Sequence, residues 1–396
     1  MNIDTAPQIR WTDNQDQPQQ ARWRSLADYP PPKRIAVVDD TLDADTAYKM
    51  ACEGTGLLWC GDFHNAKLMM QAMVRRIDSK VLRTKIKANK AGTPIAPPLS
   101  MHDAFVQYRK AQALRSRVLG MLLLPFDADH CVPLRRAPDV RPAILQARGP
   151  VDEHYVASLR ELQGLISAYE WREKGIHVGA LKGSVHAHYA VFSPVRGEYV
   201  DFVAHAPLPD CLKSSGKAGV AFDIGTGTGV LAAVLARRGV NRVVATDMDP
   251  RALTCAAENL EQLKVSSRVE LVAADLFPEG LAELIVCNPP WVPGRPTSSL
   301  EHAVYDPDSR MLRGFLAGLT AHLAPGGEGW LILSDLAEHL GLRTREELQA
   351  WISAAGLVVL SRVDAKPTHT RATDTTDPLF KARSAELTSM WRLAAA

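Results

Sequence analysis

Three glycines at alternate positions mark the strongest candidate site in the sequence. Residues 222–230 read Phe-Asp-Ile-Gly-Thr-Gly-Thr-Gly-Val, so that one apolar run ends in Asp223 and a second begins at Val230. A glycine turn between a strand and a helix lets the backbone approach a ligand closely, because no Cβ stands in the way. The dinucleotide-binding fingerprint requires a glycine where this sequence has Val230, which argues against a nicotinamide cofactor. The stretch predicts a ligand-binding loop, whose contacts we assign to Gly225, Thr226, Gly227 and Gly229.

Residues 223–229 match the first motif of class I S-adenosylmethionine-dependent methyltransferases, Asp/Glu-x-Gly-x-Gly-x-Gly, and the sequence resembles that family. The resemblance implies S-adenosylmethionine as methyl donor, with Asp223 beside its methionine moiety. It also implies that Asp247, rather than its neighbour Asp249, accepts hydrogen bonds from the ribose hydroxyls at the end of the second strand. Asp275 resembles the third-strand residue that accepts from the adenine amine. One such carboxylate alone is typical of a turn or a helix cap, whereas three in order with the glycine loop favour a cofactor site.

The tetrapeptide Asn288-Pro289-Pro290-Trp291 follows an apolar run, 59 residues after the last glycine of the loop. Two prolines end the hydrogen-bond ladder of a strand and stiffen the turn, which fixes Asn288 at the strand's carboxyl end. The Asn288 side-chain carbonyl and the Pro289 carbonyl can both accept from one NH₂ group. Amide and aromatic amines are poor nucleophiles because their lone pair is delocalised, and two fixed acceptors orient such an amine for attack. Trp291 offers a flat face for a planar acceptor. We therefore predict Asn288, Pro289 and Trp291 as catalytic residues, with Asn288 also close to the cofactor.

This tetrapeptide resembles the Asn/Asp-Pro-Pro-aromatic motif of amino-methyltransferases. Two groups share that motif: enzymes that methylate the adenine amine of DNA or RNA, and HemK-type enzymes that methylate a glutamine side chain in release factors. The segment with Pro194, Arg196 and Glu198 is similar to the Pro-Arg-Pro-Glu-Thr-type segment of HemK-type enzymes, with Gly197 replacing the second proline. Small-domain ribosomal RNA methyltransferases have a comparable Phe-rich segment. The resemblance covers about residues 185–363 and leaves the methyl acceptor open.

The elements that must position these residues are indicated by an alternation of strand-like and helix-like runs from residue 219 onward. Such alternation is typical of an α/β fold with a doubly wound, mostly parallel sheet. We predict this Rossmann-like methyltransferase domain at 205–396. Before it we expect a disordered Pro/Gln-rich tail at 1–34, an α+β substrate-recognition module at 35–150, and a helix-and-hairpin connector at 151–204.

Local patterns predict the elements of the N-terminal half. Short apolar runs predict strands at 35–38 and 57–59, and paired strands at 176–180 and 184–192. Helical spacing predicts the remaining elements, with Asp62 or Asn65 as the cap of the second helix. The predicted helices span residues 43–51, about 62–77, 101–123, 151–174 and 198–206.

Composition excludes several classes of protein. With 46% hydrophobic and 23% charged residues, the 396-residue chain has the usage of a soluble globular protein and the length of two domains. It has no run of 18 apolar residues, and the first 34 residues lack the apolar core of a secretory signal. Six cysteines without a Cys-x-x-Cys pair argue against a disulfide scaffold, and Cys52, Cys60 and His64 fit no common zinc spacing. We therefore expect a cytoplasmic protein with no metal site and no membrane partner.

Charge is distributed unevenly along the chain. Residues 75–117 carry eleven lysines and arginines against Asp78 and Asp103, a net charge of +9 in a chain whose net charge is +2. Such a window is either an electrostatic footprint for nucleic acid or a solvated helix face with a basic loop. Together with the separate N-terminal module, it favours a base amine of RNA or DNA as the methyl acceptor. A glutamine side chain in a protein is the main alternative, followed by a non-catalytic nucleic-acid-binding module with a relict cofactor pocket.

Overall fold

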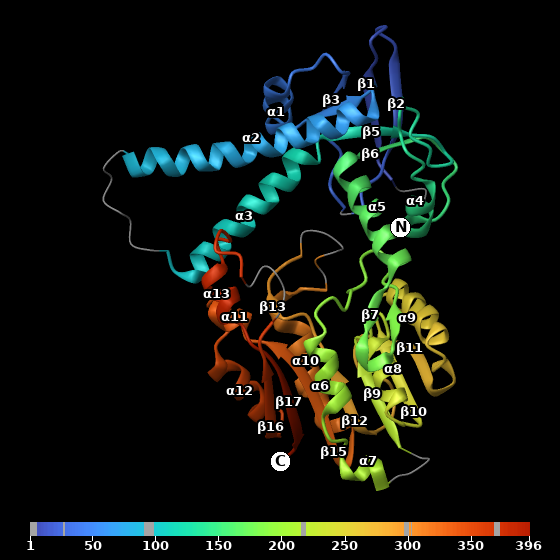
Figure 1. The fold of residues 1–396 in the computed structure, drawn as a ribbon, viewed down its shortest axis with the longest axis vertical. Coiled ribbons are helices and arrows are strands. Elements are labelled where there is room, and N and C mark those ends of the chain that lie inside the picture. The colour runs from blue at the N-terminus through green and yellow to red at the C-terminus, as the bar shows by residue number, and fades with distance from the viewer. Residues whose placement is uncertain are drawn as a thin grey trace. The chain divides into compact units, whose positions relative to one another are not determined.

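The chain divides into two compact units, each with its own sheet (Figure 1). Unit 1 comprises Met1–Ser100 and Val106–Glu170, and unit 2 comprises Met101–Phe105 and Trp171–Ala396. The computed structural model describes residues 6–26, 28–90, 99–214, 219–296, 301, 303–367 and 373–396, without the side chains of residues 80–90 and 214. Within these residues, no helix combines the length and the apolar character needed to cross a membrane.

A six-stranded mixed sheet forms the centre of unit 1, in the order β1-β2-β6-β5-β4-β3. Strands β3, β4 and β5 run parallel, and β6 is antiparallel to β5. The antiparallel pair β1–β2 joins the sheet through parallel pairing of β2 with β6. The strands are β1 (Gln8–Thr12), β2 (Pro18–Trp23), β3 (Arg34–Val38), β4 (Thr55–Trp59), β5 (Leu122–Phe126) and β6 (Tyr155–Ser158).

Two helices of this half of the chain, α1 and α2, begin at capping residues that the sequence indicates. The Asp43 side chain accepts from the backbone amides at the start of α1. Asp62 precedes α2, and its Oδ1 accepts from His64 N at 2.9 Å, so Asp62 rather than Asn65 is the cap. The helices up to residue 174 are α1 (Ala44–Cys52), α2 (Phe63–Lys90), α3 (Met101–Leu119), α4 (Arg141–Arg148) and α5 (Leu159–Lys174).

The expectation of a disordered tail at 1–34 is wrong for residues 8–23. These residues form the β1–β2 hairpin, in which Ile9 and Trp23 are each 5% exposed and pack with apolar side chains of β4, β5 and β6. Two large apolar side chains on one face are enough to attach an otherwise polar hairpin to a sheet, because alternate residues of a strand point the same way.

Two expected helices in unit 1 are shortened by strands. Residues 155–158 form β6 instead of extending a helix from residue 151, and residues 122–126 form β5 instead of the end of a helix that reaches 123. Consecutive residues are buried in both segments. Short continuous apolar runs cannot be distinguished from buried helix by periodicity alone, which explains both errors. No element is predicted at 127–150, where residues 141–148 form α4.

A seven-stranded sheet forms the centre of unit 2, in the order β11-β10-β9-β12-β15-β17-β16. The first five strands of this order pair in parallel, and β17 is antiparallel to both of its neighbours, so that β16 again runs in the direction of the first five. This confirms the predicted doubly wound, mostly parallel α/β fold. The strands are β9 (Val220–Ile224), β10 (Arg242–Asp247), β11 (Val269–Ala273), β12 (Ala282–Cys287), β15 (Leu323–Ser334), β16 (Leu357–Ala365) and β17 (Thr388–Ala395). Two short pairs accompany it: β7 (Ile176–Val178) with β8 (Gly183–Val185), and β13 (Val292–Pro293) with β14 (Tyr305–Asp306).

Helices cover both faces of this sheet (Figure 1). Helices α6, α8 and α9 share one apolar cluster with it, and α10 and α12 share the other. Burial on both faces explains why its parallel strands read as continuous apolar runs. The helices are α6 (Glu198–His205), α7 (Asp210–Ser214), α8 (Val230–Arg237), α9 (Pro250–Gln262), α10 (Arg310–His322), α11 (Leu336–His339), α12 (Arg345–Ala354) and α13 (Phe380–Ala385).

One expected strand of unit 2 is shorter than its sequence indicates. The run at 184–192 leaves the pairing after Val185, because the next backbone amide, His186 N, donates to Asn259 Oδ1 at 2.8 Å instead of to a strand. The Asn259 amide group also donates to Thr228 O at 3.1 Å, which links this segment to the glycine loop. A buried asparagine of α9 therefore determines where the hairpin ends.

The strand order of unit 2 reverses between β9 and β12. The chain continues from β9 to β10 and β11 on one side, and β12 and β15 lie on the other. Ligands of open α/β sheets bind at the carboxyl ends of the strands at such a switch point. Cys287 of β12 lies beside Ile224 of β9 in register. The segments that follow these two residues are therefore where the fold predicts a site.

Candidate functional site

The glycine loop joins β9 to α8 in a conformation that favours glycine. The backbone φ is +72° at Gly225, +55° at Gly227 and +78° at Gly229, all in the left-handed region. A Cβ at Gly225 would lie 2.5 Å from Met311 Cε, and one at Gly229 would lie 3.2 Å from Ala256 Cβ. At Gly227 a Cβ would meet nothing within 4 Å. The loop is thus packed at both ends and open in its middle.

Asp223 holds this loop from inside the protein. The residue is 1% exposed, and its Oδ2 accepts from Thr226 Oγ1 at 2.7 Å and from Ala232 N at 3.0 Å. Burial raises the pKa of Asp223 to about 6, against the effect of the two hydrogen bonds, and the charge of Asp247 adds to the increase. Asp223 therefore fixes the turn between β9 and α8. A contact with the methionine moiety of a cofactor stays a prediction.

The buried Asp223 carboxyl predicts a pH dependence of stability. Its folded-state pKa of about 6 lies above the unfolded value of about 4, so the native state binds more protons between these values. The contribution of this group to the free energy of unfolding therefore falls as pH rises through that window. The Asp223→Asn variant keeps an acceptor oxygen and removes the titration. We expect its free energy of unfolding by urea, relative to wild type, to increase with pH across the window, and a flat difference would contradict the pKa shift.

Asp247 lies at the carboxyl end of β10 and faces the glycine loop. Its Oδ2 accepts from Gly227 N at 3.0 Å, and its Oδ1 accepts from Asp249 N at 2.9 Å. Burial raises the pKa of this carboxyl. A carboxylate has about four acceptor positions, so two backbone contacts leave capacity for the hydroxyls of a ribose. Asp249 instead caps α9 and pairs with Arg251 at 3.0 Å. Asp249 is thus engaged within α9, whereas Asp247 faces the glycine loop, and the ribose contact of Asp247 stays a prediction.

Asp275 follows β11 and is engaged in a bidentate ion pair with Arg310. Arg310 Nη1 donates to Oδ1 at 3.1 Å, and Nη2 donates to Oδ2. Arg310 is held in place because Asp306 fixes the start of α10, accepting from Met311 N at 3.0 Å and from Leu312 N at 3.1 Å. The Asp306 carboxylate therefore binds the first turn of α10. An adenine amine would share Asp275 with Arg310, which the sequence did not reveal because 35 positions separate the pair.

Asn288 follows β12 directly and is partly buried, as is Trp291. Asn288 Oδ1 accepts from Trp291 Nε1 at 2.9 Å. Arg196 Cζ lies 4.8 Å from the centroid of the Trp291 ring. Arg196 therefore occupies one face of that ring, so that a planar acceptor would have to stack on the other. Pro289 is buried and fixes the turn.

The structure brings most of the predicted site to neighbouring strand ends. In register, Val286 of β12 lies beside Asp223 of β9, and Thr246 of β10 lies beside Ile224 of β9. The glycine loop, Asp247 and Asn288 consequently lie at the carboxyl ends of three adjacent strands, β9, β10 and β12. Asp275 emerges from β11, the fourth strand, with its carboxylate bound to Arg310.

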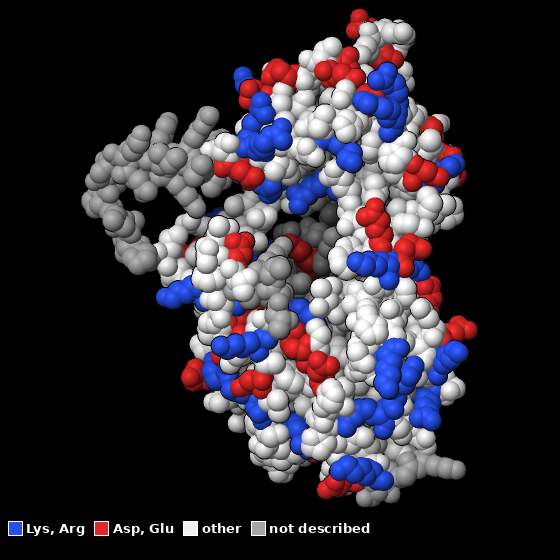
Figure 2. Space-filling view, in the orientation of Figure 1, with Lys and Arg blue, Asp and Glu red and all other residues white. Residues whose placement is uncertain are grey.

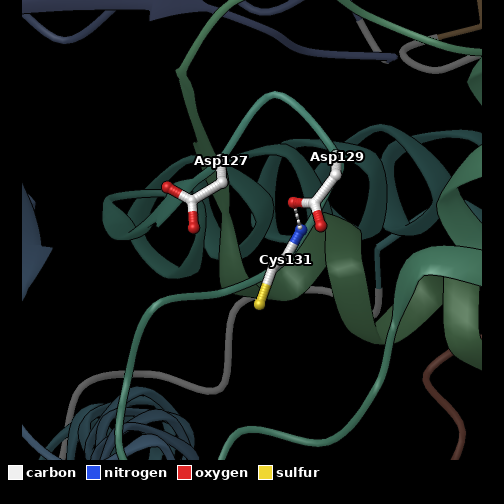
Figure 3. Close-up of side chains that lie close together, drawn as sticks. All are labelled: Asp127, Asp129 and Cys131. Carbon is white, nitrogen blue, oxygen red and sulfur yellow. Dashed lines mark hydrogen bonds between the residues drawn. The ribbon is translucent and has the colours of Figure 1, made fainter.

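One side-chain group among the described residues has the spacing of metal ligands, and it lies in unit 1 (Figure 3). Ligand atoms of Asp127, Asp129 and Cys131 lie within 4.8 Å of one another. Asp129 Oδ1 accepts from Cys131 N at 3.0 Å, and Asp127 N donates to Cys131 O at 2.9 Å. Asp127 also pairs with His154 at 3.1 Å. The group is therefore explained as a hydrogen-bonded turn after β5.

Comparisons with known proteins find similarity over part of unit 2. Residues 182–344 match the family model described as the methyltransferase small domain. The chain is 35% identical over 154 residues to a release factor glutamine methyltransferase of Cereibacter sphaeroides, which covers 35% of this chain and 52% of the relative. It is 43% identical over 165 residues to a ribosomal protein L11 methyltransferase of Pelotomaculum thermopropionicum, with coverages of 40% and 46%.

A third relative is a tRNA1(Val) (adenine(37)-N6)-methyltransferase of Shewanella loihica, 31% identical over 153 residues, with coverages of 36% and 60%. The chain spans about half the length of the first two of these curated relatives. The matched range contains the glycine loop, Asp247, Asp275 and Asn288. The resemblance stated from the sequence is confirmed over residues 182–344, which match the methyltransferase small domain and are similar to class I S-adenosylmethionine-dependent methyltransferases.

Proposed function

We propose that this protein is an S-adenosylmethionine-dependent N-methyltransferase whose acceptor is an exocyclic base amine of a cytoplasmic nucleic acid. One observation carries the proposal: Asn288 and the glycine loop emerge from β12 and β9, which pair side by side across the switch point of the sheet. A cofactor loop and an amine-binding asparagine at this position can hold the two partners of a methyl transfer next to each other.

The residues of this site fit S-adenosylmethionine. The loop is open at Gly227, where a Cβ would fill space that no protein atom occupies within 4 Å. Asp247 keeps acceptor capacity beside it for two ribose hydroxyls, and Asp275 offers a carboxylate at the next strand end. The cofactor, when bound, supplies an electrophilic methyl group on a positively charged sulfur.

The chain's own contribution to the reaction is to orient the amine. Asn288 Oδ1 uses one lone pair for the Trp291 indole and keeps a second for an amine N–H. The Pro289 carbonyl supplies the other acceptor, and together they direct the nitrogen lone pair and favour pyramidalisation. Cys287, the titratable neighbour, is unsuited as a base because burial raises the pKa of its thiol well above the ordinary value.

The choice of nucleic acid over protein rests on charge. The relatives include a tRNA adenine methyltransferase and a release factor glutamine methyltransferase, so both acceptor classes agree with the family. Within the described side chains of residues 75–117, Arg76 pairs with Asp45 at 2.6 Å and Arg115 pairs with Asp78. On the face shown in Figure 2, acidic and basic side chains both occur on unit 1.

The side chains of Lys80, Arg83, Lys85, Lys87 and Lys90 lie outside the described residues. Methylation of a glutamine side chain is the second candidate function, favoured by the partial similarity of the segment containing Arg196 and Glu198 to that of HemK-type enzymes.

Binding of a nucleic acid through the basic window predicts a steep salt dependence. The logarithm of acceptor affinity should fall against the logarithm of salt concentration by about 0.7 to 0.9 per phosphate contact, measured by fluorescence anisotropy with total tRNA. The triple variant Arg83→Ala, Lys85→Ala, Lys87→Ala should flatten this slope. The matched control is Arg76→Gln with Arg115→Gln, because both guanidinium groups are already paired with aspartates. An affinity that does not change with salt would contradict nucleic-acid binding by this window, and its basic residues would then be explained as a solvated surface.

The acceptor class is tested by label transfer. The protein is incubated with a tritiated methyl donor and whole-cell extract, and portions are then treated with nuclease or with protease. Release of the label by nuclease is the expected result. Release by protease alone would favour the glutamine alternative, and no incorporation with any fraction would favour a non-catalytic binding module.

A further inference from the structure

A chain of three side chains connects the segment before α6 to Asn288. The Arg196 guanidinium lies over the Trp291 ring, with Cζ 4.8 Å from the centroid. Trp291 Nε1 in turn donates to Asn288 Oδ1 at 2.9 Å. All three residues belong to unit 2. Arg196 therefore touches the side chain that touches the candidate catalytic asparagine.

Two carboxylates hold Arg196 in one orientation. Its Nε donates to Glu198 Oε1 at 3.0 Å, and its Nη1 and Nη2 donate to Glu386 Oε1 at 3.1 and 3.0 Å. The Glu198 and Glu386 side chains are 9% and 1% exposed. Glu386 Oε1 also accepts from Ser334 Oγ at 2.6 Å, at the carboxyl end of β15. A planar guanidinium bound through three nitrogens has little rotational freedom, so its face toward Trp291 is fixed by the sheet.

The indole N–H decides which way the Asn288 amide is turned. An indole nitrogen only donates hydrogen bonds, so it must meet the amide oxygen rather than the amide nitrogen. The positive charge of Arg196 over the ring draws electron density from it and favours Nε1–H as a donor. Without this contact, the amide could rotate and present NH₂ to an incoming amine, which would repel it.

We propose that Arg196 is a positioning residue for methyl transfer. It holds the Trp291 indole in contact with Asn288, and this contact keeps the Asn288 oxygen turned toward the acceptor amine. The inference rests on the proposed function, because the orientation of Asn288 affects a rate only if Asn288 binds the acceptor. Arg196 itself acts through Trp291. A purely structural role of Arg196, as the partner of the buried Glu386, is the alternative to be separated from it.

Two variants remove different contacts in the series from Arg196 through Trp291 to Asn288. Trp291→Phe keeps an aromatic ring and loses the N–H donor. Arg196→Lys keeps a positive charge near Glu386 and loses the planar fork. Each should lower kcat about three- to tenfold, the range that corresponds to one lost hydrogen bond, and leave cofactor affinity unchanged. The matched control is Arg238→Lys, because Arg238 Cζ also lies over an indole, 5.9 Å from the centroid of Trp330, while its guanidinium donates to the Val203 and Ala206 carbonyls. Its kcat should equal that of wild type.

The double variant separates the positioning role from the structural one. If Arg196 acts through the indole N–H, Arg196→Lys combined with Trp291→Phe should be no slower than Trp291→Phe alone. Losses that multiply would show that Arg196 acts independently of Trp291 and would overturn the proposal. Thermal unfolding of each variant identifies any loss that comes from misfolding, and Trp291→Phe leaves the buried carboxylates untouched.

A spectroscopic readout keeps this inference distinct from the proposed function. The Trp291 Nε1–H resonance, assigned by its absence in Trp291→Phe, should shift in both Asn288→Ala and Arg196→Lys. An unchanged resonance in Arg196→Lys would overturn the inference whatever the turnover. If the resonance shifts as expected but Asn288→Ala retains full turnover, the contact chain stands and the catalytic assignment of Asn288 fails.

Discussion

The Asn288→Ala variant is expected to lose about 100- to 1,000-fold in kcat, the usual loss for one preorganised hydrogen-bonding group at a reacting centre. Asn288 Oδ1 is already fixed by Trp291 at 2.9 Å, so its remaining lone pair meets the acceptor amine without reorganisation. The affinity for S-adenosylmethionine should change little, because the loop and Asp247 are untouched. Steady-state methyl transfer and calorimetric titration of the cofactor measure the two quantities separately.

The control for this variant is Asn288→Asp. An aspartate keeps an acceptor oxygen at the same position, and the motif that this sequence resembles admits either residue. We expect Asn288→Asp to retain more turnover than Asn288→Ala. Near-normal turnover in Asn288→Ala would remove this residue from the mechanism, whereas equal losses in both variants would show that the amide, rather than an acceptor oxygen, is required.

The Asp247→Ala variant is expected to weaken cofactor binding by about 1.5–3 kcal/mol, or roughly 10- to 150-fold in Kd, because it removes charge-assisted acceptors for the ribose. It also releases Gly227 N, which Asp247 Oδ2 holds at 3.0 Å, so the loop loses a restraint in the same step. Isothermal titration calorimetry with S-adenosylmethionine measures the change directly.

Asp249→Ala is the matched control for this measurement. Asp249 lies two residues away and carries the same charge, but it caps α9 and pairs with Arg251. Its loss should lower the stability of α9 by about 1 kcal/mol and leave the cofactor Kd nearly unchanged. A larger change in Kd for Asp249→Ala than for Asp247→Ala would reverse the assignment of the ribose-binding residue.

The parts of the site that the sequence predicts are those encoded by local motifs. The glycine loop needs positive φ at three positions, and only glycine adopts that conformation readily. The pattern can therefore be recognised in a short stretch of the sequence. The two prolines after β12 mark the end of a strand for a similarly local reason. The order of the apolar runs then predicts a parallel sheet, which brings both motifs to one edge.

Contacts between distant residues could not be predicted in this way. Arg310 and Asp275 are 35 positions apart, and Arg196 and Glu386 are 190 apart. Each pair depends on how helices and loops pack on the sheet, and a single sequence carries no signal for such a pairing. The β1–β2 hairpin was missed for a related reason, because its attachment depends on Ile9 and Trp23 finding an apolar surface made by later strands.

Identification of the atom that receives the methyl group tests the proposed function most directly. The purified protein is incubated with labelled S-adenosylmethionine and total RNA, the RNA is hydrolysed to nucleosides, and the labelled nucleoside is identified by mass spectrometry. We expect a single methyl group on an exocyclic base nitrogen, formed about 100- to 1,000-fold more slowly by Asn288→Ala. A methyl group on a ribose oxygen or a ring carbon, or label recovered only as methylglutamine from a protein fraction, would contradict it.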